Sequence, residues 1–385
     1  MTIGPWGILA ALFVARLGMG YQFQLVASTA PQLQPAFALS YTDIGSLIGL
    51  YMLPGLALAM PSGWLGARFG ERRLVTIGLA LMALGTAWCA MAPDFAQLGA
   101  GRLLAGFGAI LMNVLMTKLV MDWFAKRNTV LAMAIFMNAW PAGVATALLV
   151  QAPMSAAYGW PAAFWSGALL AALGLAIFVI VHRPAPGAAT QADGRWPIRA
   201  ELPALLLCTS VWALYNIAFA LMFGFGPWLL ASQSGNVVSA NALISMVMWI
   251  ATVATPVGGL LMQRIDGGRF MVPAVMAVYA ASLFVLAQIS TSVPVLILMA
   301  IVAPSPAGAI MALPARILAP ASRALGMGLF FTIFYIGMAL GPAIAGWSID
   351  ITGDRSVPLI IAAALSLVSA VLFIATWRMV GARQP

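Results

Sequence analysis

The chain has 385 residues, of which 63% are hydrophobic and 7% charged, and its mean hydropathy is +1.02. A soluble protein carries about 25% charged residues, so the composition excludes a water-soluble globular domain and predicts an all-α membrane protein. The net charge of +9 does not indicate a nucleic-acid partner, because the basic residues sit in short loops between apolar segments. Cys89 and Cys208 lie inside apolar segments without metal or redox spacing, so we expect no metal, no disulfide and no cofactor.

Apolar stretches long enough to cross a bilayer recur from end to end of the sequence and predict twelve transmembrane helices. Their expected ranges are 6–30, 42–62, 74–92, 95–119, 129–150, 160–181, 202–226, 240–262, 271–290, 294–316, 324–347 and 358–379. An even number puts both termini on one side, and almost all loop Arg and Lys residues fall on that side. The positive-inside rule therefore places both termini in the cytoplasm. Residues 1–5 are too short and uncharged for a signal-peptide n-region, so we expect a retained first helix in a bacterial inner (plasma) membrane protein.

The first predicted helix carries an arginine, Arg16, about 15 Å along the helix from Trp6. Polar residues follow it at Tyr21, Gln22 and Gln24. Three roles remain open for Arg16: an anion-binding group, a structural group that caps backbone carbonyls, or a side chain that reaches the cytoplasmic interface. The guanidinium fork matches a carboxylate in two parallel hydrogen bonds.

A short basic turn separates the second and third predicted helices and contains Gly63, Arg68, Gly70 and Arg72. Its pattern, Gly-x-Leu-x-x-Arg-x-Gly-x-Arg-Arg, resembles the signature loop between helices 2 and 3 of the major facilitator superfamily of secondary transporters. Ala67 stands where that family usually has Asp, which weakens the charge relay that the family attributes to this loop. The resemblance implies twelve helices in two six-helix repeats, a substrate site near the bilayer midplane and transport by alternating access.

The fourth predicted helix carries a second intramembrane arginine, Arg102, within Arg-x-x-x-Gly-x-Gly. This too resembles a superfamily motif, in which the arginine is often structural and bonds to helix 1. We leave both a structural and a substrate-binding role open for it. Lys118 and Arg316 lie near helix ends and fit interfacial or gating positions better than ligands. The turn that follows the fourth predicted helix, from Asp122 to Arg127, looks like the family's acidic–Phe–Arg turn.

A polar segment rich in Pro, Gly and Ala, 183–201, predicts a flexible cytoplasmic linker. It divides the chain into an N-terminal bundle, 1–182, and a C-terminal bundle, 202–385. A shift of 196 residues superposes landmarks of the two halves, which indicates an internal repeat. The matching pairs are Phe23 and Phe219, Pro31 and Pro227, Leu33 and Leu229, Gly63 and Gly259, Leu65 and Leu261, Arg68 and Arg264, and Arg127 and Arg323.

Neutral polar and aromatic residues complete the candidate substrate site. They are Asn113 on helix 4, Asn138 and Trp140 on helix 5, Trp212, Tyr215 and Asn216 on helix 7, and Tyr335 on helix 11. Trp212 occupies the repeat position of Arg16, which predicts an asymmetric site with an aromatic wall opposite the charge. Contacts between helices explain a buried Asn as readily as contacts with substrate.

Helix-breaking residues mark three positions where the backbone ladder should be interrupted. These are Pro304-Ser305-Pro306 in helix 10, the segment from Gly337 to Gly346 in helix 11, and Trp140-Pro141-Ala142-Gly143 in helix 5. In a transporter such interruptions indicate moving parts, although close helix packing is the alternative.

All nine acidic residues fall in loops or at helix ends, so no carboxylate lies in mid-membrane. An intramembrane arginine without a nearby acid favours a small anionic substrate. We therefore predict a secondary or facilitated transporter of a small anion, and we expect a monomer in the lipid bilayer. Among the superfamily branches, the chain resembles the cyanate/nitroimidazole porters or the monocarboxylate-type porters.

Two alternatives stay open. An exporter of hydrophobic drugs would suit the 23 Met residues and the aromatic content. A non-transporting membrane sensor is the alternative from another class. We do not expect an enzyme, because no His, Cys or acidic constellation at membrane depth could perform catalysis.

Overall fold

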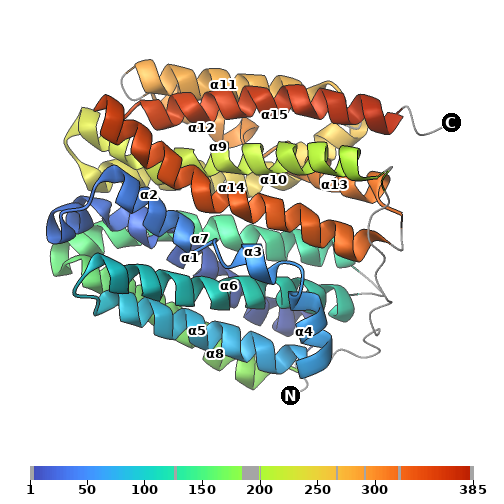
Figure 1. Ribbon diagram of the computed structural model, residues 1–385, viewed down its shortest axis with the longest axis horizontal. Helices are drawn as coiled ribbons and strands as arrows, with labels where there is room; N and C mark the ends of the chain where they lie inside the picture. Colours follow the sequence, from blue (N-terminus) through green and yellow to red (C-terminus); the bar gives the residue numbers. More distant parts are fainter. Residues whose placement is uncertain are drawn as a thin grey trace. The chain divides into compact units, whose positions relative to one another are not determined.

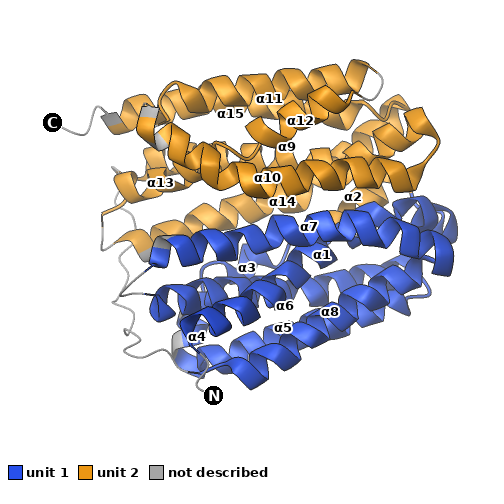
Figure 2. Ribbon diagram, turned by 180° about the vertical axis from the view of Figure 1, so that it is seen from behind, with its two compact units in different colours: residues 1–39, 50–192 blue, residues 40–49, 193–385 orange. Residues whose placement is uncertain are grey.

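The computed structural model describes residues 4–124, 128–183, 199, 201–265, 268–289, 292–319 and 322–381, and every regular element in these ranges is helical (Figure 1). Within these ranges eleven helical stretches are long and apolar enough to cross a membrane, with Val293–Ile317 counted as one stretch. The described chain forms two compact units: unit 1 contains residues 1–39 and 50–192, and unit 2 contains residues 40–49 and 193–385 (Figure 2).

Unit 1 is a bundle of long helices with two short ones. Its helices are α1 (Pro5–Phe37), α3 (Gly55–Leu58), α4 (Ser62–Phe69), α5 (Glu71–Ala90), α6 (Phe95–Trp123), α7 (Thr129–Tyr158) and α8 (Trp160–Val181). Asp94 caps α6 by accepting the backbone N–H of Gln97 at 2.8 Å. Gly70 and Gly159 take positive φ angles at the α4–α5 and α7–α8 junctions, which only glycine adopts without strain.

Unit 2 contains the helices of the second half of the sequence and one helix of the first. They are α2 (Tyr41–Leu50), α9 (Leu202–Ser234), α10 (Val237–Ile265), α11 (Met271–Gln288), α12 (Val293–Val302), α13 (Ala307–Ile317), α14 (Arg323–Thr352) and α15 (Val357–Gly381). Cys208 lies in the apolar core of this unit, and both cysteines of the chain are buried and free.

The two units repeat the same packing scheme. In unit 1, α1 packs against α7 and α8, and α5 packs against α8. In unit 2, α9 packs against α14 and α15, and α11 packs against α15. The helices α1 and α9 each have 33 residues and contain Pro31 and Pro227 at nearly the same position. This pairing confirms the pseudo-symmetric repeat expected from the sequence.

The expected second transmembrane helix, 42–62, is interrupted rather than continuous. It consists of α2, α3 and α4, and Pro54 and Pro61 stand directly before the last two. Proline has no N–H and cannot continue a helix ladder from within. The predicted break at Pro304-Ser305-Pro306 is confirmed, because α12 ends before it and α13 begins after it.

The other two predicted interruptions are wrong. Both α7 and α14 continue through their prolines, Pro141 and Pro342. Their glycines serve close packing instead: a Cβ on Gly143 would lie 2.1 Å from the carbonyl oxygen of Leu17, and one on Gly346 would lie 2.0 Å from that of Tyr41. The alternative reading of these glycines as packing residues is therefore the correct one.

Segment 40–49 differs from the expected domain scheme, which placed it in the N-terminal bundle. The Asp350 carboxylate near the end of α14 accepts the backbone N–H groups of Tyr41 and Thr42, at 2.9 and 2.8 Å, at the start of α2. A Cβ on Gly45 would lie 2.1 Å from the carbonyl oxygen of Pro342. A capped helix start and a glycine contact thus join α2 to α14 within unit 2. The expected linker 183–201 lies almost entirely outside the described residues, and the domain boundaries remain predictions.

Candidate functional site

The candidate site of unit 1 lies where α1 closely approaches α7. A Cβ on Gly20 would lie 2.2 Å from the carbonyl oxygen of Trp140, and Gly143 makes the reciprocal approach to Leu17. Glycines on both helices allow the backbones to meet in this way. The approach brings Arg16, one turn before Gly20, against residues of α7.

The Arg16 side chain contacts three groups from two neighbouring helices. Its Nη1 donates a hydrogen bond to Oδ1 of Asn113 on α6, at 2.5 Å. Its Nη2 lies 3.3 Å from the sulfur of Met137 on α7. The guanidinium carbon lies 4.5 Å from the ring centroid of Phe136, a cation–π distance. These three contacts are with neutral groups, and Arg16 itself is only half-buried.

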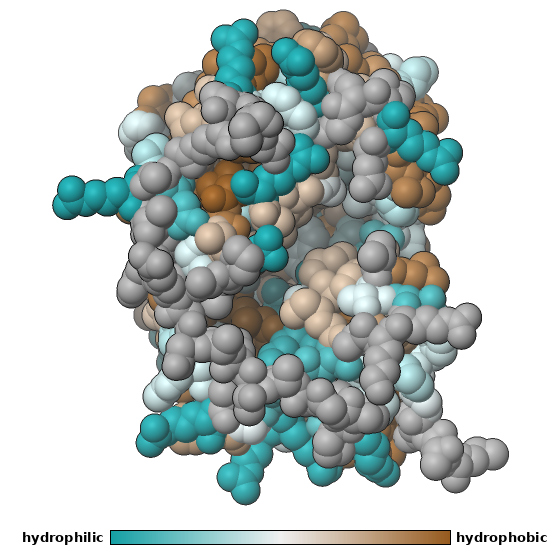
Figure 3. Space-filling view, turned by 90° about the vertical axis from the view of Figure 1, so that its right-hand side faces the viewer, coloured by the Kyte–Doolittle hydropathy of each residue, from teal (hydrophilic) through white to brown (hydrophobic). Residues whose placement is uncertain are grey.

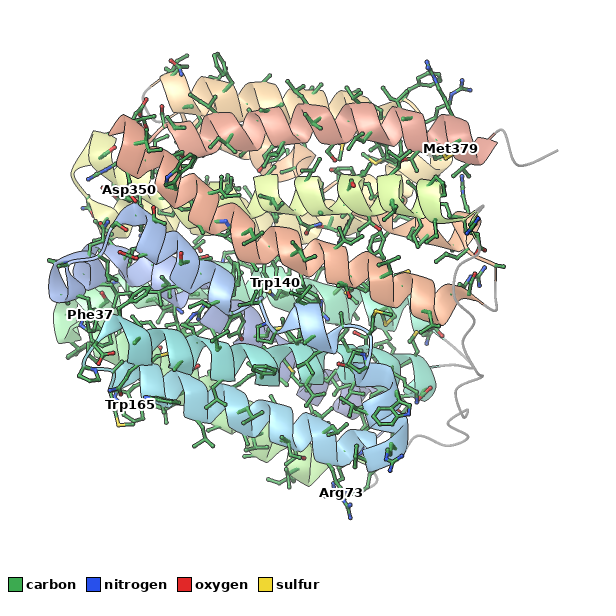
Figure 4. The ribbon with its side chains drawn as sticks, in the orientation of Figure 1. Phe37, Arg73, Trp140, Trp165, Asp350 and Met379 are labelled. Atoms are coloured by element: carbon green, nitrogen blue, oxygen red, sulfur yellow. The ribbon has the colours of Figure 1, made fainter. Side chains whose placement is uncertain are left out.

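The Arg16 cluster lies deep within the helices and away from their ends. Arg16 is about 16 Å from the start of α1, and Asn113 is about 15 Å from the end of α6. The α1 start and α6 end lie together, because the rings of Trp6 and Phe124 are 5.1 Å apart. Trp140, further along α7, is labelled midway along unit 1 in Figure 4. Its ring centroid lies 5.6 Å from that of Phe23 on α1. Reaching interfacial water is therefore not the role of Arg16 in this structure.

Three predicted site residues that follow Arg16 are buried inside unit 1. The Tyr21 hydroxyl shares a hydrogen bond with Ser166 of α8 at 2.7 Å. The Gln22 side chain donates to the carbonyl oxygen of Gly167 at 3.0 Å. Gln24 is fully buried. The contacts of Tyr21 and Gln22 tie α1 to α8, so in this structure both hold helices together.

Arg102 is almost completely buried, with 1% of its surface exposed. Its Nη1 donates to the carbonyl oxygen of Gln22 at 2.8 Å, and its Nη2 to that of Phe23 at 3.5 Å. Its guanidinium also lies over the Tyr51 ring, 4.5 Å from the centroid. These contacts fit the structural role left open from the sequence, a bond from α6 to α1. Asn138 is half-buried on α7, directly after Met137.

The predicted residues of unit 2 gather in an aromatic cluster on α9 and α14. The Trp212 ring lies 5.8 Å from Tyr215, 6.3 Å from Phe330 and 6.2 Å from Phe334. Tyr335 stacks edge-on beside Phe334 and is buried. The Asn216 amide donates to the carbonyl oxygen of Trp212, at 2.8 Å, within its own helix.

Tyr215 has a structural contact that its sequence position did not suggest. Its hydroxyl donates to the carbonyl oxygen of Ala303 at 2.9 Å, where the chain breaks between α12 and α13. The break diverts the Ala307 N–H to the carbonyl of Pro304. Tyr215 therefore satisfies a backbone acceptor that the broken helix leaves without its usual partner.

The basic turn lies at the end of unit 1 where α5 starts and α8 ends, because Arg72 donates to the carbonyl oxygen of Val179 at 3.3 Å. Arg68 is exposed and its guanidinium lies 5.5 Å from the Trp64 ring centroid. Hydrophilic side chains, coloured teal, project around the face seen in Figure 3, and the labelled Arg73 points away from the helices in Figure 4. Gly63 lies in α4, whereas Arg127 lies outside the described residues.

Lys118 forms the centre of an ion-pair cluster at this end of unit 1. Its ammonium group contacts Glu71 at the start of α5 and Asp122 on α6, the latter at 2.8 Å. All three side chains are about four-fifths buried. Glu71 belongs to the basic turn, so this cluster supplies a carboxylate close to the turn in which Ala67 replaces the family's Asp.

The described carboxylates lie at helix ends, as the sequence indicates. Asp43 is in the first turn of α2, Glu71 begins α5, Asp94 caps α6 and Asp350 is near the end of α14. In the ranges that the structure describes, no group of three or more His, Cys, Asp or Glu side chains could hold a metal ion.

Phe136 and Met137 are the two functional candidates that the sequence analysis missed. An apolar residue pair in an apolar helix carries no signal of its own in a single sequence. Their position directly before Asn138 was the available clue, because neighbouring residues of one helix share the same depth.

A polytopic helical membrane protein with two repeated bundles is the class that this fold defines. The profile of the Major Facilitator Superfamily matches residues 12–235 and, again, residues 207–384. The chain belongs to the Major Facilitator Superfamily.

Curated relatives match parts of the chain. The inner membrane transport protein YajR of Escherichia coli is 30% identical over 46% of this chain and 38% of its own length. The multidrug efflux pump LfrA of Mycolicibacterium smegmatis is 30% identical over 55% of this chain and 42% of its own. A gallate transporter of Pseudomonas putida is 27% identical over 43% of this chain and 37% of its own. The matches thus span less than half of each relative.

Solved structures match the whole fold. A bacterial homologue of the human lysosomal transporter Spinster, in an inward-facing and occupied conformation, aligns with a TM-score of 0.76. The alignment covers 97% of this chain and 96% of the other, at 16% sequence identity. This similarity shows a shared fold.

Proposed function

We propose that the protein is a secondary or facilitated transporter that moves a small, singly charged organic anion across the membrane by alternating access. Membership of the superfamily supports transport, as do the names of relatives that include a transport protein, an efflux pump and a gallate transporter. We also propose a monomer in a bacterial inner membrane, with both termini in the cytoplasm, on the distribution of basic loops.

The environment of Arg16 is the main support for an anionic substrate. Its guanidinium is half-buried inside unit 1 and is held by an amide oxygen, a thioether and an aromatic ring. Intramembrane ionisable groups are expensive and mark substrate or ion paths. A guanidinium at this depth offers planar N–H donors that match the two oxygens of a carboxylate.

The same charge argues against a simple cation as substrate. Two like charges about 4 Å apart repel by about 4 kcal/mol at an effective dielectric constant near 20. That free energy corresponds to a loss of affinity of roughly a thousandfold. A cation would therefore bind poorly beside Arg16. An anion would gain a Coulomb attraction of similar size, from which the free energy of removing its water is subtracted.

The positions of the carboxylates bear on energy coupling. Because the described acids lie at helix ends, we propose that the protein has no mid-membrane carboxylate relay for protons. It would act as an anion exchanger or a uniporter, or take up its anion together with a proton held by the substrate or by the Arg16 network.

Counterflow in proteoliposomes tests the proposal. Purified protein is reconstituted with gallate inside, and uptake of labelled gallate is compared with uptake of its neutral primary amide and of a cationic amine of equal size. We expect uptake of the acid to exceed that of both analogues. Uptake of the amine without uptake of the acid would overturn the anion assignment.

An exporter of hydrophobic compounds is the second candidate, and the aromatic cluster of unit 2 is the observation that favours it. Trp212 and Phe334 are half-buried side chains on adjacent helices, and flat apolar ligands stack on such rings. Efflux of ethidium from the same proteoliposomes, with no response to gallate, would support this candidate over the first.

A further inference from the structure

We propose that Asn113 is the specificity-determining residue of the Arg16 site: its neutral amide oxygen holds the guanidinium in place and gives way to a substrate oxygen. This inference rests on the proposed anion transport and names the group that keeps the site selective for anions. It concerns the hydrogen bond of 2.5 Å between Arg16 Nη1 and Asn113 Oδ1.

The geometry makes Asn113 the polar acceptor in this cluster that a substrate can replace. Two further contacts of Arg16, with the Met137 sulfur and the Phe136 ring, hold the guanidinium through weak or non-directional interactions. A carboxylate oxygen forms a stronger, charge-assisted hydrogen bond to a guanidinium than an amide oxygen does. An incoming carboxylate can therefore take the Nη1 donor from Asn113, while Phe136 continues to support the guanidinium from its face.

The neutrality of Asn113 is what permits this exchange. An Asp at this position is nearly the same size, but its carboxylate would form an internal ion pair with Arg16. A substrate anion would then have to displace this carboxylate, which is covalently held beside the guanidinium and cannot diffuse away. The same unit shows what such pairing looks like. Lys118 lies five residues further along α6 and is held by two carboxylates, Glu71 and Asp122.

The backbone of Asn113 is held within α6, so a substrate would displace its side chain alone. Its backbone carbonyl accepts the Thr117 hydroxyl at 2.8 Å, one turn further along α6. Asn113 is half-buried, like Arg16, so both side chains retain some accessible surface. A monovalent carboxylate is the simplest anion that could reach the guanidinium there.

The test compares three substitutions of one side chain. Asn113→Asp keeps the shape and adds a charge, Asn113→Leu keeps the approximate volume and removes the acceptor, and Asn113→Thr keeps a neutral acceptor. Each variant is purified, checked for monodispersity and melting temperature, and reconstituted. The probes are gallate and its primary amide, which differ in charge and little in shape.

The readout is the ratio of gallate to amide uptake, because this ratio cancels differences in the amount of active protein. We expect Asn113→Asp to lower the ratio by about tenfold or more, whereas Asn113→Thr and Asn113→Leu keep it within about threefold. An unchanged ratio in Asn113→Asp would overturn the inference. So would an equal fall in Asn113→Leu, because a neutral residue would then lower the ratio as much as a charged one. The wild-type ratio is read first. Should the wild type not favour the acid, the proposed function itself fails, independently of the variants.

Discussion

The two intramembrane arginines of unit 1 have the same side chain and opposite surroundings. Arg102 is 1% exposed and donates to backbone carbonyls of α1, which cannot be exchanged for a ligand without disrupting the helix contact. Arg16 is half-buried and contacts side chains, of which one is a neutral amide. An arginine bound to main chain stabilises the bundle, and one bound to movable neutral side chains can receive a substrate. Burial and the type of partner distinguish the two roles, whereas the sequence position does not.

The largest expected effect is the loss of folded protein on substitution of Arg102. Arg102→Gln removes a charged donor from two buried carbonyls, and hydrogen bonds to charged groups contribute about 1.5–3 kcal/mol each. We expect destabilisation of about 3 kcal/mol or more and a sharp fall in detergent-soluble protein. Fluorescence-detected size-exclusion chromatography with a thermal ramp measures it. A stable Arg102→Gln protein with impaired transport would break the comparison.

Arg16→Lys should leave the protein folded and remove most of its transport. Lysine keeps the charge but loses the planar fork that recognises a carboxylate. We expect a loss of about tenfold or more in initial gallate uptake, with a melting temperature within about 2 °C of the wild type. The melting temperature is the control here. Full activity in Arg16→Lys, at normal expression, would return Arg16 to a structural role.

The close approach of α1 and α7 should matter for Arg16 and less for Arg102. Gly20→Ala places a methyl group 2.2 Å from the Trp140 carbonyl oxygen, so the two helices must separate, at a cost of about 1–3 kcal/mol. Separation moves Arg16 away from Met137 on α7, whereas the two carbonyls that accept from Arg102 belong to α1 and neither belongs to α7. We expect lower uptake and a lower melting temperature.

Gly18→Ala is the matched control on the same helix. A Cβ there would lie 3.8 Å from the nearest atom, a side-chain carbon of Leu170, which is an ordinary contact. We expect a change in stability within about 0.5 kcal/mol. Equal effects of Gly18→Ala and Gly20→Ala would show that the α1–α7 approach does not position the site.

The smallest effect concerns His182, a basic group that, unlike either arginine, can lose its charge. It follows α8 and is buried, and its pKa lies below the ordinary 6.5 because burial, Arg72 and Arg183 all disfavour the charged ring. The folded protein therefore resists protonation, and stability is lost as the pH falls below the ordinary pKa. We expect His182→Gln to reduce the fall in melting temperature between pH 7.5 and pH 5.5 by no more than about 2 °C. An identical fall in both proteins would show that His182 does not contribute.

The fold could be predicted largely from the sequence, because the length and the apolar character of each helix can be read from one continuous segment. The repeat was visible through residues such as Pro31 and Pro227, which stand out against an apolar background. The interruption at Pro54 and the continuity of α7 through Pro141 were not visible. A proline lacks its N–H in both settings, and only the neighbouring helices decide whether the ladder continues.

The site was predictable in part. Arg16 and Asn113 could be named because polar groups in an apolar helix are rare and therefore informative. Their partnership could not, since it depends on a tertiary contact across 97 positions of sequence. Tyr21, Gln22 and Tyr215 are also polar residues within apolar helices, yet their contacts tie helices together. Single-sequence reasoning cannot separate these outcomes because both require a polar group inside the membrane.

The placement of α2 has a consequence for dividing the protein into fragments. The chain passes between its two units after Leu39, after Gly49 and after Ala192, so the halves of the sequence are not the halves of the structure. A break at residue 192 would give an N-terminal fragment that carries α2 without α14, and a C-terminal fragment that exposes Asp350 and Gly346. Each fragment would then present a surface that fits the other. Co-expressed fragments should complement one another, and deleting segment 40–49 from the first should abolish complementation.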